Sequence, residues 1–171
     1  MLKDAGCSYV IIGHSERRKY FHETNETVNK KLKAAITAGL LPIVCVGETL
    51  EQRQKGKTFD VIKDHIEGSL AGLTKEDMKK VIIAYEPVWA IGTGVNATPQ
   101  QAEEAHSYIR KLLADIFDEE TAQDTRVQYG GSVTPENIKE LIAEKDVDGA
   151  LVGGASLKVD SFGKIVKGAV K

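Results

Sequence analysis

Short apolar runs alternate with longer amphipathic stretches along the chain. The runs are rich in β-branched residues, and most are continuously apolar rather than alternating. That pattern is typical of parallel strands that are buried on both faces. It predicts strands at residues 9–12, 42–46, 81–85, 126–129 and 149–152.

Amphipathic stretches fill the gaps between the predicted strands, and their apolar side chains recur at helical spacing. These stripes lie within residues 28–36, 61–70, 102–116, 138–142 and 162–169. Gly39 follows the first stripe and suits the C-terminal stop of a helix. The second stripe includes His65. The chain is therefore predicted to alternate strands with helices.

Helix start signals precede the later stripes. Thr98 suits an N-cap, Pro99 the first helical position, and Gln101 the reciprocal partner in a capping box. A Thr-Pro pair at 134–135 repeats the signal, and Asp160 is expected to open the final helix.

The pattern amounts to about five βα units of roughly 30 residues each, joined by short connections. Right-handed crossovers between such units give a parallel sheet, which is either doubly wound or closed into a barrel. The hydrophobic pattern does not choose between these two architectures. No linker, low-complexity tract or change in composition divides the chain, so residues 1–171 are expected to form a single domain.

The first residues have the pattern of a helix end. Residues 2–6 read as a last helical turn closed by Gly6, leading directly into the strand at 9–12. This indicates that the chain begins in the middle of an architecture. A complete eight-stranded barrel takes ~250 residues, so five units leave about three unassigned.

Composition excludes several classes of protein. The 23 basic and 25 acidic residues leave a net charge of −2, so no basic field favours nucleic acid or an anionic membrane. With 42% hydrophobic and 28% charged residues, the composition is that of a folded globular chain. No apolar stretch approaches a membrane span, and the start lacks the core of a signal peptide. Only Cys7 and Cys45 are present, which favours a reducing, cytosolic setting.

Candidate chemistry lies where strands end, because function in parallel α/β folds gathers in the loops at the carboxyl edge of the sheet. His14 follows the first strand and precedes polar residues that can start a helix, whose N-terminus would disfavour the imidazolium. Glu86 closes the third strand at the border of the apolar interior, where a carboxylate is a candidate general base. Pro87 holds the backbone of Glu86 extended.

Glycine-rich segments at the same edge favour a phosphorylated ligand. The segment from Val88 to Ala97 is apolar in its first half and glycine-rich in its second, which suits a water-excluding lid. Glycine pairs follow the last two strands, at 130–131 and 153–154, where backbone N–H groups can approach an anion. The G-x-G-x-x-A spacing at 92–97 lies too far from a strand to indicate a dinucleotide site.

Other reactive residues receive structural interpretations. Glu48 is expected to form an ion pair or a helix start, and Cys45 to be a small buried residue rather than a nucleophile. No second histidine or cysteine stands at ligand spacing from His14, so no metal site is predicted. The remaining histidines, including His65 and His106, are assigned no chemistry.

Four runs of residues resemble the triosephosphate isomerase family, in the same order along the chain. They extend from Tyr9 to Arg18, from Ala84 to Gly94, from Tyr129 to Ser132 and from Gly149 to Leu157. The second run is similar to the family's active-site signature together with its lid. The resemblance covers the whole chain and corresponds to the last five βα units of the family. It implies an α/β fold that is part of a (β/α)8 TIM barrel.

The resemblance also implies a role for each candidate residue. Glu86 resembles the base that removes a proton beside the substrate carbonyl, and His14 the neutral imidazole that polarises it, a pairing for which this family is a standard example. Supporting polar positions are matched by Ser15 and Glu16. The phosphate-gripping part of the lid is matched by Ala90, Ile91, Gly92, Thr93 and Gly94, and the rest of the phosphate cradle by the backbone of Ser132, Gly153 and Gly154.

The implied reaction interconverts dihydroxyacetone phosphate and D-glyceraldehyde 3-phosphate, a step of glycolysis and gluconeogenesis. It needs a small phosphorylated triose as substrate and neither metal nor organic cofactor. Family membership further implies a cytoplasmic location and a homodimer.

Two features of the family have no counterpart among these residues: the Asn-x-Lys segment of its first strand and the dimer-forming loop after its third strand. We therefore expect unpaired edges at the first and last strands. Interior side chains such as Ile12, Val44 and Ile83 are expected to lose packing partners, leaving the isolated chain loosely packed or aggregation-prone. Two alternatives stay open. The chain is a non-catalytic fragment or assembly module, or it is another phosphate-binding βα-barrel enzyme with a different acid–base pair.

Overall fold

The computed structural model describes residues 1–92 and 96–170. Within these ranges the strands form one parallel sheet whose spatial order follows the sequence. The strands are β1 (Tyr9–Ile12), β2 (Leu41–Val46), β3 (Ile82–Tyr85), β4 (Val127–Tyr129) and β5 (Gly149–Ala150). All five predicted strands are confirmed. In a doubly wound sheet the strand order reverses at one point. Here it does not reverse, so the arrangement is that of a barrel segment.

Helices occupy the predicted gaps between the strands. The helices are α1 (Ser15–Phe21), α2 (Asn25–Thr37), α3 (Leu50–Gln54), α4 (Thr58–Ser69), α5 (Lys75–Met78), α6 (Pro99–Ile116), α7 (Glu119–Asp124), α8 (Ile138–Ala143) and α9 (Val159–Gly168), with 3-10 turns η1 (Val88–Ala90) and η2 (Gly154–Leu157). Among the described helices, none is long and apolar enough to cross a membrane.

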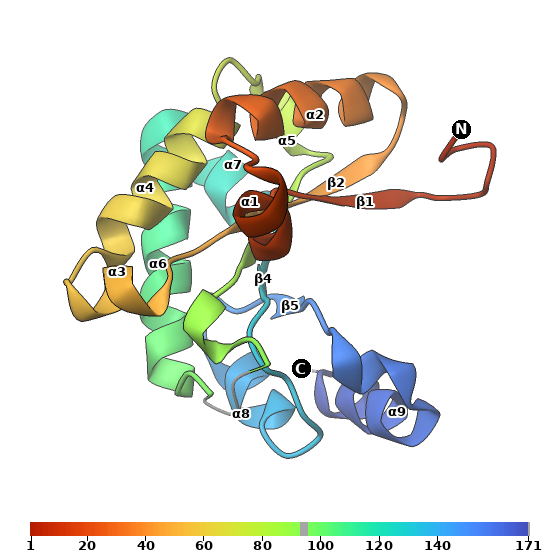
Figure 1. The fold of residues 1–171 in the computed structure, drawn as a ribbon, viewed down its shortest axis with the longest axis vertical. Helices are drawn as coiled ribbons and strands as arrows, with labels where there is room; N and C mark the ends of the chain where they lie inside the picture. The colour runs from red at the N-terminus through yellow and green to blue at the C-terminus, as the bar shows by residue number, and fades with distance from the viewer. Residues whose placement is uncertain (93–95, 171) are drawn as a thin grey trace.

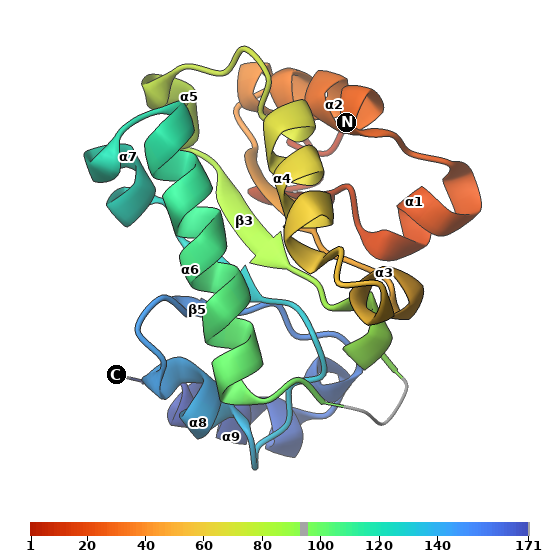
Figure 2. The ribbon, with the colours of Figure 1, turned by 90° about the vertical axis from the view of Figure 1, so that its left-hand side faces the viewer.

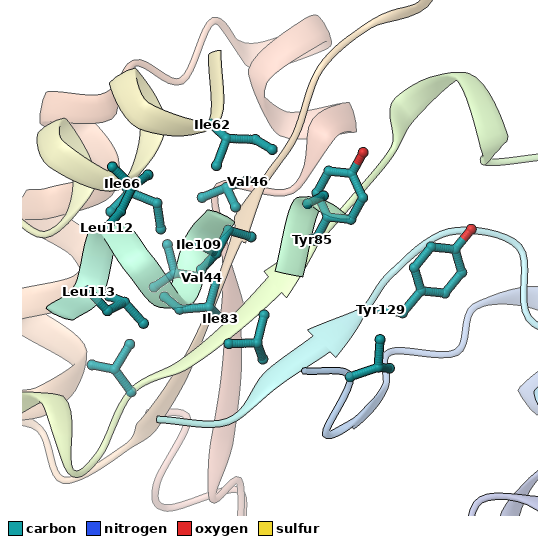
Figure 3. Close-up of a cluster of buried hydrophobic side chains, with 14 of the residues drawn as sticks. Val44, Val46, Ile62, Ile66, Ile83, Tyr85, Ile109, Leu112, Leu113 and Tyr129 are labelled. Carbon is teal, nitrogen blue, oxygen red and sulfur yellow. The ribbon is translucent and has the colours of Figure 1, made fainter. Parts of the chain in front are cut away.

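One face of the sheet is covered by a layer of helices. Helix α2 packs on β1 and β2, α4 on β2, and α6 on β4, and the three helices also contact each other in sequence. Figures 1 and 2 show α4 and α6 side by side across this face, with α8 and α9 gathered beyond β5. The main core lies between these layers (Figure 3), where Val44, Val46 and Ile83 of the sheet meet side chains of α4 and α6.

The opposite, concave face is sparsely packed. Because successive side chains of a strand alternate between faces, the neighbours of Val44 point the other way. Ile43, Cys45 and Ala84 form a small separate cluster there. On β1, Tyr9 and Ile11 lie 52% and 46% exposed. The edge strand is therefore not buried on both faces.

One expectation about packing was wrong. Ile12, Val44 and Ile83 were expected to lose their partners, yet they are 4%, 0% and 0% exposed. They belong to the core beneath the helices, so they face away from the concave side. A continuously apolar strand carries no phase that tells which residues face which way.

The predicted helix start signals can be compared with the structure at residues 98–101 and 134–135. Thr98 caps α6 with Pro99 in its first turn and a reciprocal bond from Gln101, as predicted. The signal at 134–135 marks the turn that leads into α8. The N–H of Thr134 donates to Oδ1 of Asn137 at 2.8 Å, and Oγ1 of Thr134 accepts from the N–H of Asn137 at 3.4 Å, while α8 itself begins at Ile138. Residues 2–6 form a turn that ends at Gly6 with φ +84°.

Candidate active site

Two side chains from separate strand ends meet at the carboxyl edge of the sheet. Nε2 of His14 lies 2.9 Å from Oε1 of Glu86. The backbone N–H of Ser15 donates to Oε2 of the same carboxylate at 3.1 Å. The Glu86 side chain is only 3% exposed, whereas that of His14 is 29% exposed. The structure thus brings together residues that stand far apart in the sequence.

The start of α1 fixes the imidazole of His14. His14 is the N-cap of this helix, and its Nδ1 accepts from the backbone N–H of Glu16 at 3.3 Å. Because Nδ1 acts as an acceptor, Nε2 is the nitrogen that carries the proton donated to Glu86. One imidazole therefore connects a helix N-terminus to a buried carboxylate.

The electrostatic balance at His14 differs from the expectation. The helix N-terminus was expected to disfavour the imidazolium, but the hydrogen bond to the Glu86 carboxylate raises the pKa of His14, with burial acting in the opposite direction. The expected direction was wrong because a direct hydrogen bond from His14 to a buried carboxylate outweighs the effects that favour the neutral ring.

The backbone of Glu86 is held by the turn that follows β2. The N–H of Glu86 donates to the carbonyl of Val46 at 2.7 Å, and the N–H of Val88 donates to that of Glu48 at 3.0 Å. Gly47 lies between these two bonds, and a Cβ on it would stand 1.9 Å from the carbonyl oxygen of Glu86. Only glycine allows this close approach.

Glu86 borders a cavity of about 580 Å³, whose wall also includes Gly13 and Ser15, the neighbours of His14 in the sequence. This volume lies in the usual range for small-molecule sites. Its wall includes Ser15, Glu16, Glu86 and Ile91 of the predicted site. The cavity lies between the ends of β1, β2 and β3 and the first turns that follow them.

Glu48 and Cys45, for which structural roles were expected, are both buried. Glu48 is fully buried, and its carboxylate accepts from the Trp89 indole at 2.8 Å and from the Arg53 guanidinium at 3.2 Å. Burial, reinforced by the nearby Glu86 carboxylate, raises the pKa of the Cys45 thiol well above its ordinary value. A thiol held protonated is a poor nucleophile, in line with its interpretation as a small buried residue.

The remaining predicted residues lie elsewhere along the same edge. Ala90 is buried in η1, and its carbonyl accepts from the N–H of Ser132 at 3.0 Å. Gly153 and Gly154 begin η2 and are exposed. Ser132 and this glycine pair do not line the cavity beside Glu86.

Gly92 has φ +66° with open space around it. The predictions at Thr93 and Gly94 lie outside the described residues, as does Val95 of the discounted dinucleotide spacing. Among the residues that the structure describes, no three or more His, Cys, Asp or Glu side chains are grouped to hold a metal ion.

The sequence interpretation missed His65, which was assigned no chemistry. Its side chain reaches from α4 into the wall of the cavity, and its Nδ1 accepts from the N–H of Gly47 at 3.3 Å. The available signal was its place in an otherwise largely apolar helical stripe, which directs the ring inward. Burial and the nearby Arg18 lower its pKa to about 4.

Comparison with known proteins gives a single result. The sequence profile of the family described as "Triosephosphate isomerase" matches residues 1–169. The triosephosphate isomerase of Geobacter metallireducens is 61% identical over 97% of this chain, which spans 66% of that protein. That of Carboxydothermus hydrogenoformans is 61% identical over 99% of the chain and 68% of its own length. That of Dictyoglomus turgidum is 59% identical over 98% of the chain and 67% of its length.

The chain thus spans about two thirds of the length of these relatives. The match extends over nearly every residue and includes both strand ends that carry the His14–Glu86 pair. The chain therefore belongs to the triosephosphate isomerase family.

Proposed function

We propose that this chain supplies the base and the imidazole that interconvert dihydroxyacetone phosphate and D-glyceraldehyde 3-phosphate. The observation that carries the proposal is the 2.9 Å contact of His14 with Glu86, which lines a cavity of about 580 Å³. Membership in the family supports the same substrate class.

The chemistry requires one proton acceptor and one hydrogen-bond donor. Glu86 takes a proton from the carbon beside the carbonyl, which leaves an enediolate, and returns a proton to the neighbouring carbon. His14 donates from Nε2 to the oxygen that gains negative charge and passes protons between the two oxygens. Electrons are only redistributed within the substrate, so no oxidant or cofactor enters the balance.

A substrate carbonyl must replace the present hydrogen bond between the two residues. Entry of the carbonyl oxygen beside Nε2 of His14 frees Oε1 of Glu86 to face carbon. Ser15 keeps its bond to Oε2 during this exchange, which holds the carboxylate at the cavity wall. Glu16 supports the arrangement by fixing Nδ1 of His14 through its backbone N–H.

The phosphate end of the site belongs to the same proposal. Ser132, Gly153 and Gly154 would contribute backbone N–H groups to a dianion, and Ala90 to Gly92 would close over it. Because the Ser132 N–H is bonded to the Ala90 carbonyl, phosphate binding must exchange this bond. The proposed lid and cradle are thereby mechanically connected.

Location and self-association are proposed on the same footing. Cys7 and Cys45 are both free thiols, which suits the cytoplasm. Helix α1 buries none of its residues, and Tyr20 and Phe21 on it are 61% and 65% exposed. Such a surface suits a second copy, and sedimentation velocity would measure the association.

Deuterium uptake tests the activity. The folded chain is incubated with dihydroxyacetone phosphate in D₂O, alone and with a polypeptide that supplies the remaining third of a relative's length. We expect carbon-bound deuterium in the product. The His14→Gln substitution should lower the rate about 10²–10³-fold, as is typical when a donor to a developing oxyanion is removed.

His22→Asn is the matched control, because His22 is exposed and ends α1 in a left-handed conformation that asparagine accepts. It should keep the rate of the unmodified chain. A folded chain that incorporates no deuterium in either mixture would instead be a non-catalytic module.

A further inference from the structure

His65 lies behind the proposed base without touching it. Its Nδ1 accepts from the backbone N–H of Gly47 at 3.3 Å, and its ring lines the same cavity as Glu86. His65 comes from α4, whereas Gly47 belongs to the turn after β2. The imidazole therefore connects the outer helical layer to the edge of the sheet.

The turn at Gly47 forms backbone hydrogen bonds on both sides of Glu86. Its flanking carbonyls, those of Val46 and Glu48, accept from the N–H groups of Glu86 and Val88 at 2.7 and 3.0 Å. Gly47 itself packs so closely on the Glu86 carbonyl that a Cβ there would stand 1.9 Å from the oxygen. Any shift of Gly47 is therefore passed directly to Glu86.

The backbone N–H of Gly47, between these two carbonyls, donates to His65. We propose that His65 is a positioning residue: by holding Gly47, it fixes the backbone of Glu86 and hence the distance from the carboxylate to His14. The inference rests on the proposed function, in which Glu86 is the base. It extends that function by adding a residue that acts on the base through backbone contacts alone.

Burial, together with the charge of Arg18, keeps Nδ1 of His65 unprotonated and able to accept. Arg18 of α1 and Asp64 of α4 act on the ring in opposite directions, and Cys45 and Glu86 share the cavity with it. Burial is the largest effect and, with Arg18, lowers the pKa of His65 to about 4. A protonated ring would lose the lone pair that Gly47 needs. At neutral pH the bond is therefore maintained.

The pKa of His14 is the readout, because the bond to Glu86 raises it. We would titrate the imidazole of His14 by NMR in the full chain, in His65→Leu and in His65→Asn. In His65→Leu, which removes the acceptor, the pKa of His14 should fall by about 0.5 to 1. In His65→Asn, whose amide oxygen takes the place of Nδ1 and can accept from Gly47, it should return to the original value.

His106→Leu is the matched control. It also removes a buried imidazole and one hydrogen bond, but the partner of His106 is the carbonyl of Asp146. The pKa of His14 should therefore be unchanged in this variant. An unchanged pKa in folded His65→Leu, or a lowered one in His65→Asn, would overturn the inference.

A measurement on the unmodified chain covers the case in which His65→Leu does not fold. The ¹⁵N shifts of His65 at neutral pH must identify Nε2 as the protonated nitrogen. A ring protonated on Nδ1 could not accept from Gly47 and would also overturn the proposal.

These readouts need no turnover, so they stand or fall separately from the deuterium experiment. If the chain is active, His65→Leu should lower kcat about tenfold with a smaller change in KM, because the proposed effect is on the position of the base. A changed KM with an unchanged kcat would argue against positioning of the base.

Discussion

Two buried glutamates follow neighbouring strands, Glu48 after β2 and Glu86 after β3, and they have opposite surroundings. The carboxylate of Glu48 accepts from the Tyr85 hydroxyl, the Trp89 indole and the Arg53 guanidinium. Glu86 accepts from His14, from the backbone N–H of Ser15 and from the Cys45 thiol, and it borders the cavity. The two carboxylates are almost equally buried, but that of Glu48 is saturated with hydrogen-bond donors and that of Glu86 has few.

The difference shows what burial alone does not determine. A buried carboxylate whose oxygens are saturated with donors stabilises the fold, because removing any partner leaves a polar group unpaired. A buried carboxylate with few donors beside an open volume can exchange a partner for substrate. Of the two, only Glu86 is therefore suited to proton transfer, and the following changes test that distinction.

Glu86→Gln should have the largest effect. The amide keeps the shape of the side chain but cannot take a proton from carbon, so the isomerisation rate should fall about 10²–10⁴-fold. The free energy of unfolding, measured in urea, should change by roughly 1 kcal/mol. A large loss of stability with little loss of rate per folded molecule would place Glu86 in the structural class with Glu48.

Gly47→Ala should damage both glutamates, because Gly47 is the turn between them. The added methyl would meet the carbonyl oxygen of Glu86 at 1.9 Å, so the backbone has to shift. We expect a loss of about 3 kcal/mol in the free energy of unfolding, together with a reduced rate. Gly56→Ala, between α3 and α4, is the control. Gly56 also has a positive φ, but no atom stands within 4 Å of an added Cβ, so this variant measures the backbone cost without the steric clash. Equal losses in both variants would contradict the close packing of Gly47 on Glu86.

Acid should weaken the core behind Tyr85. His106 packs edge-on against the Tyr85 ring at 5.9 Å, and burial lowers its pKa from 6.5 to about 4. Between these values the unfolded chain binds more protons than the folded one, so stability falls as pH drops from 6.5 towards 4. The loss at His106 should be about 2–3 kcal/mol.

Urea unfolding across this pH range measures the effect. His106→Gln removes one of two buried histidines whose pKa is lowered to about 4, the other being His65, and should make the profile less steep. A profile as steep in this variant as in the unmodified chain would assign the acid sensitivity to other groups.

Glu48→Gln should have the smallest effect and should act on stability. Gln retains an oxygen for the Trp89 indole but loses the charge that pairs with Arg53, itself partly exposed and able to take water instead. We expect a loss of about 1–2 kcal/mol in the free energy of unfolding and an unchanged rate per folded molecule. A rate loss comparable to that of Glu86→Gln would erase the distinction between the two carboxylates.

Local signals were strong enough to predict much of the molecule. The β-branched runs gave all the strands, and Thr98, Pro99 and Gln101 marked the start of α6. The placement of His14 and Glu86 at strand ends made them candidates, and the family resemblance then implied their roles. The Thr-Pro signal at 134–135 also lies at a helix start, because Thr134 and Asn137 make reciprocal bonds in the turn that leads into α8.

Pattern along the chain thus determined which residues form strands and helices, and which polar residues stand at the carboxyl edge. Tertiary structure decided three further matters: that the strand order never reverses, that Ile12 and Val44 face the helices, and that His65 holds Gly47. Periodicity reports only the neighbours of a residue along its own segment. Strand order, the phase of an apolar strand and the pKa of His14 depend on contacts between residues far apart in sequence, which only the folded chain brings together.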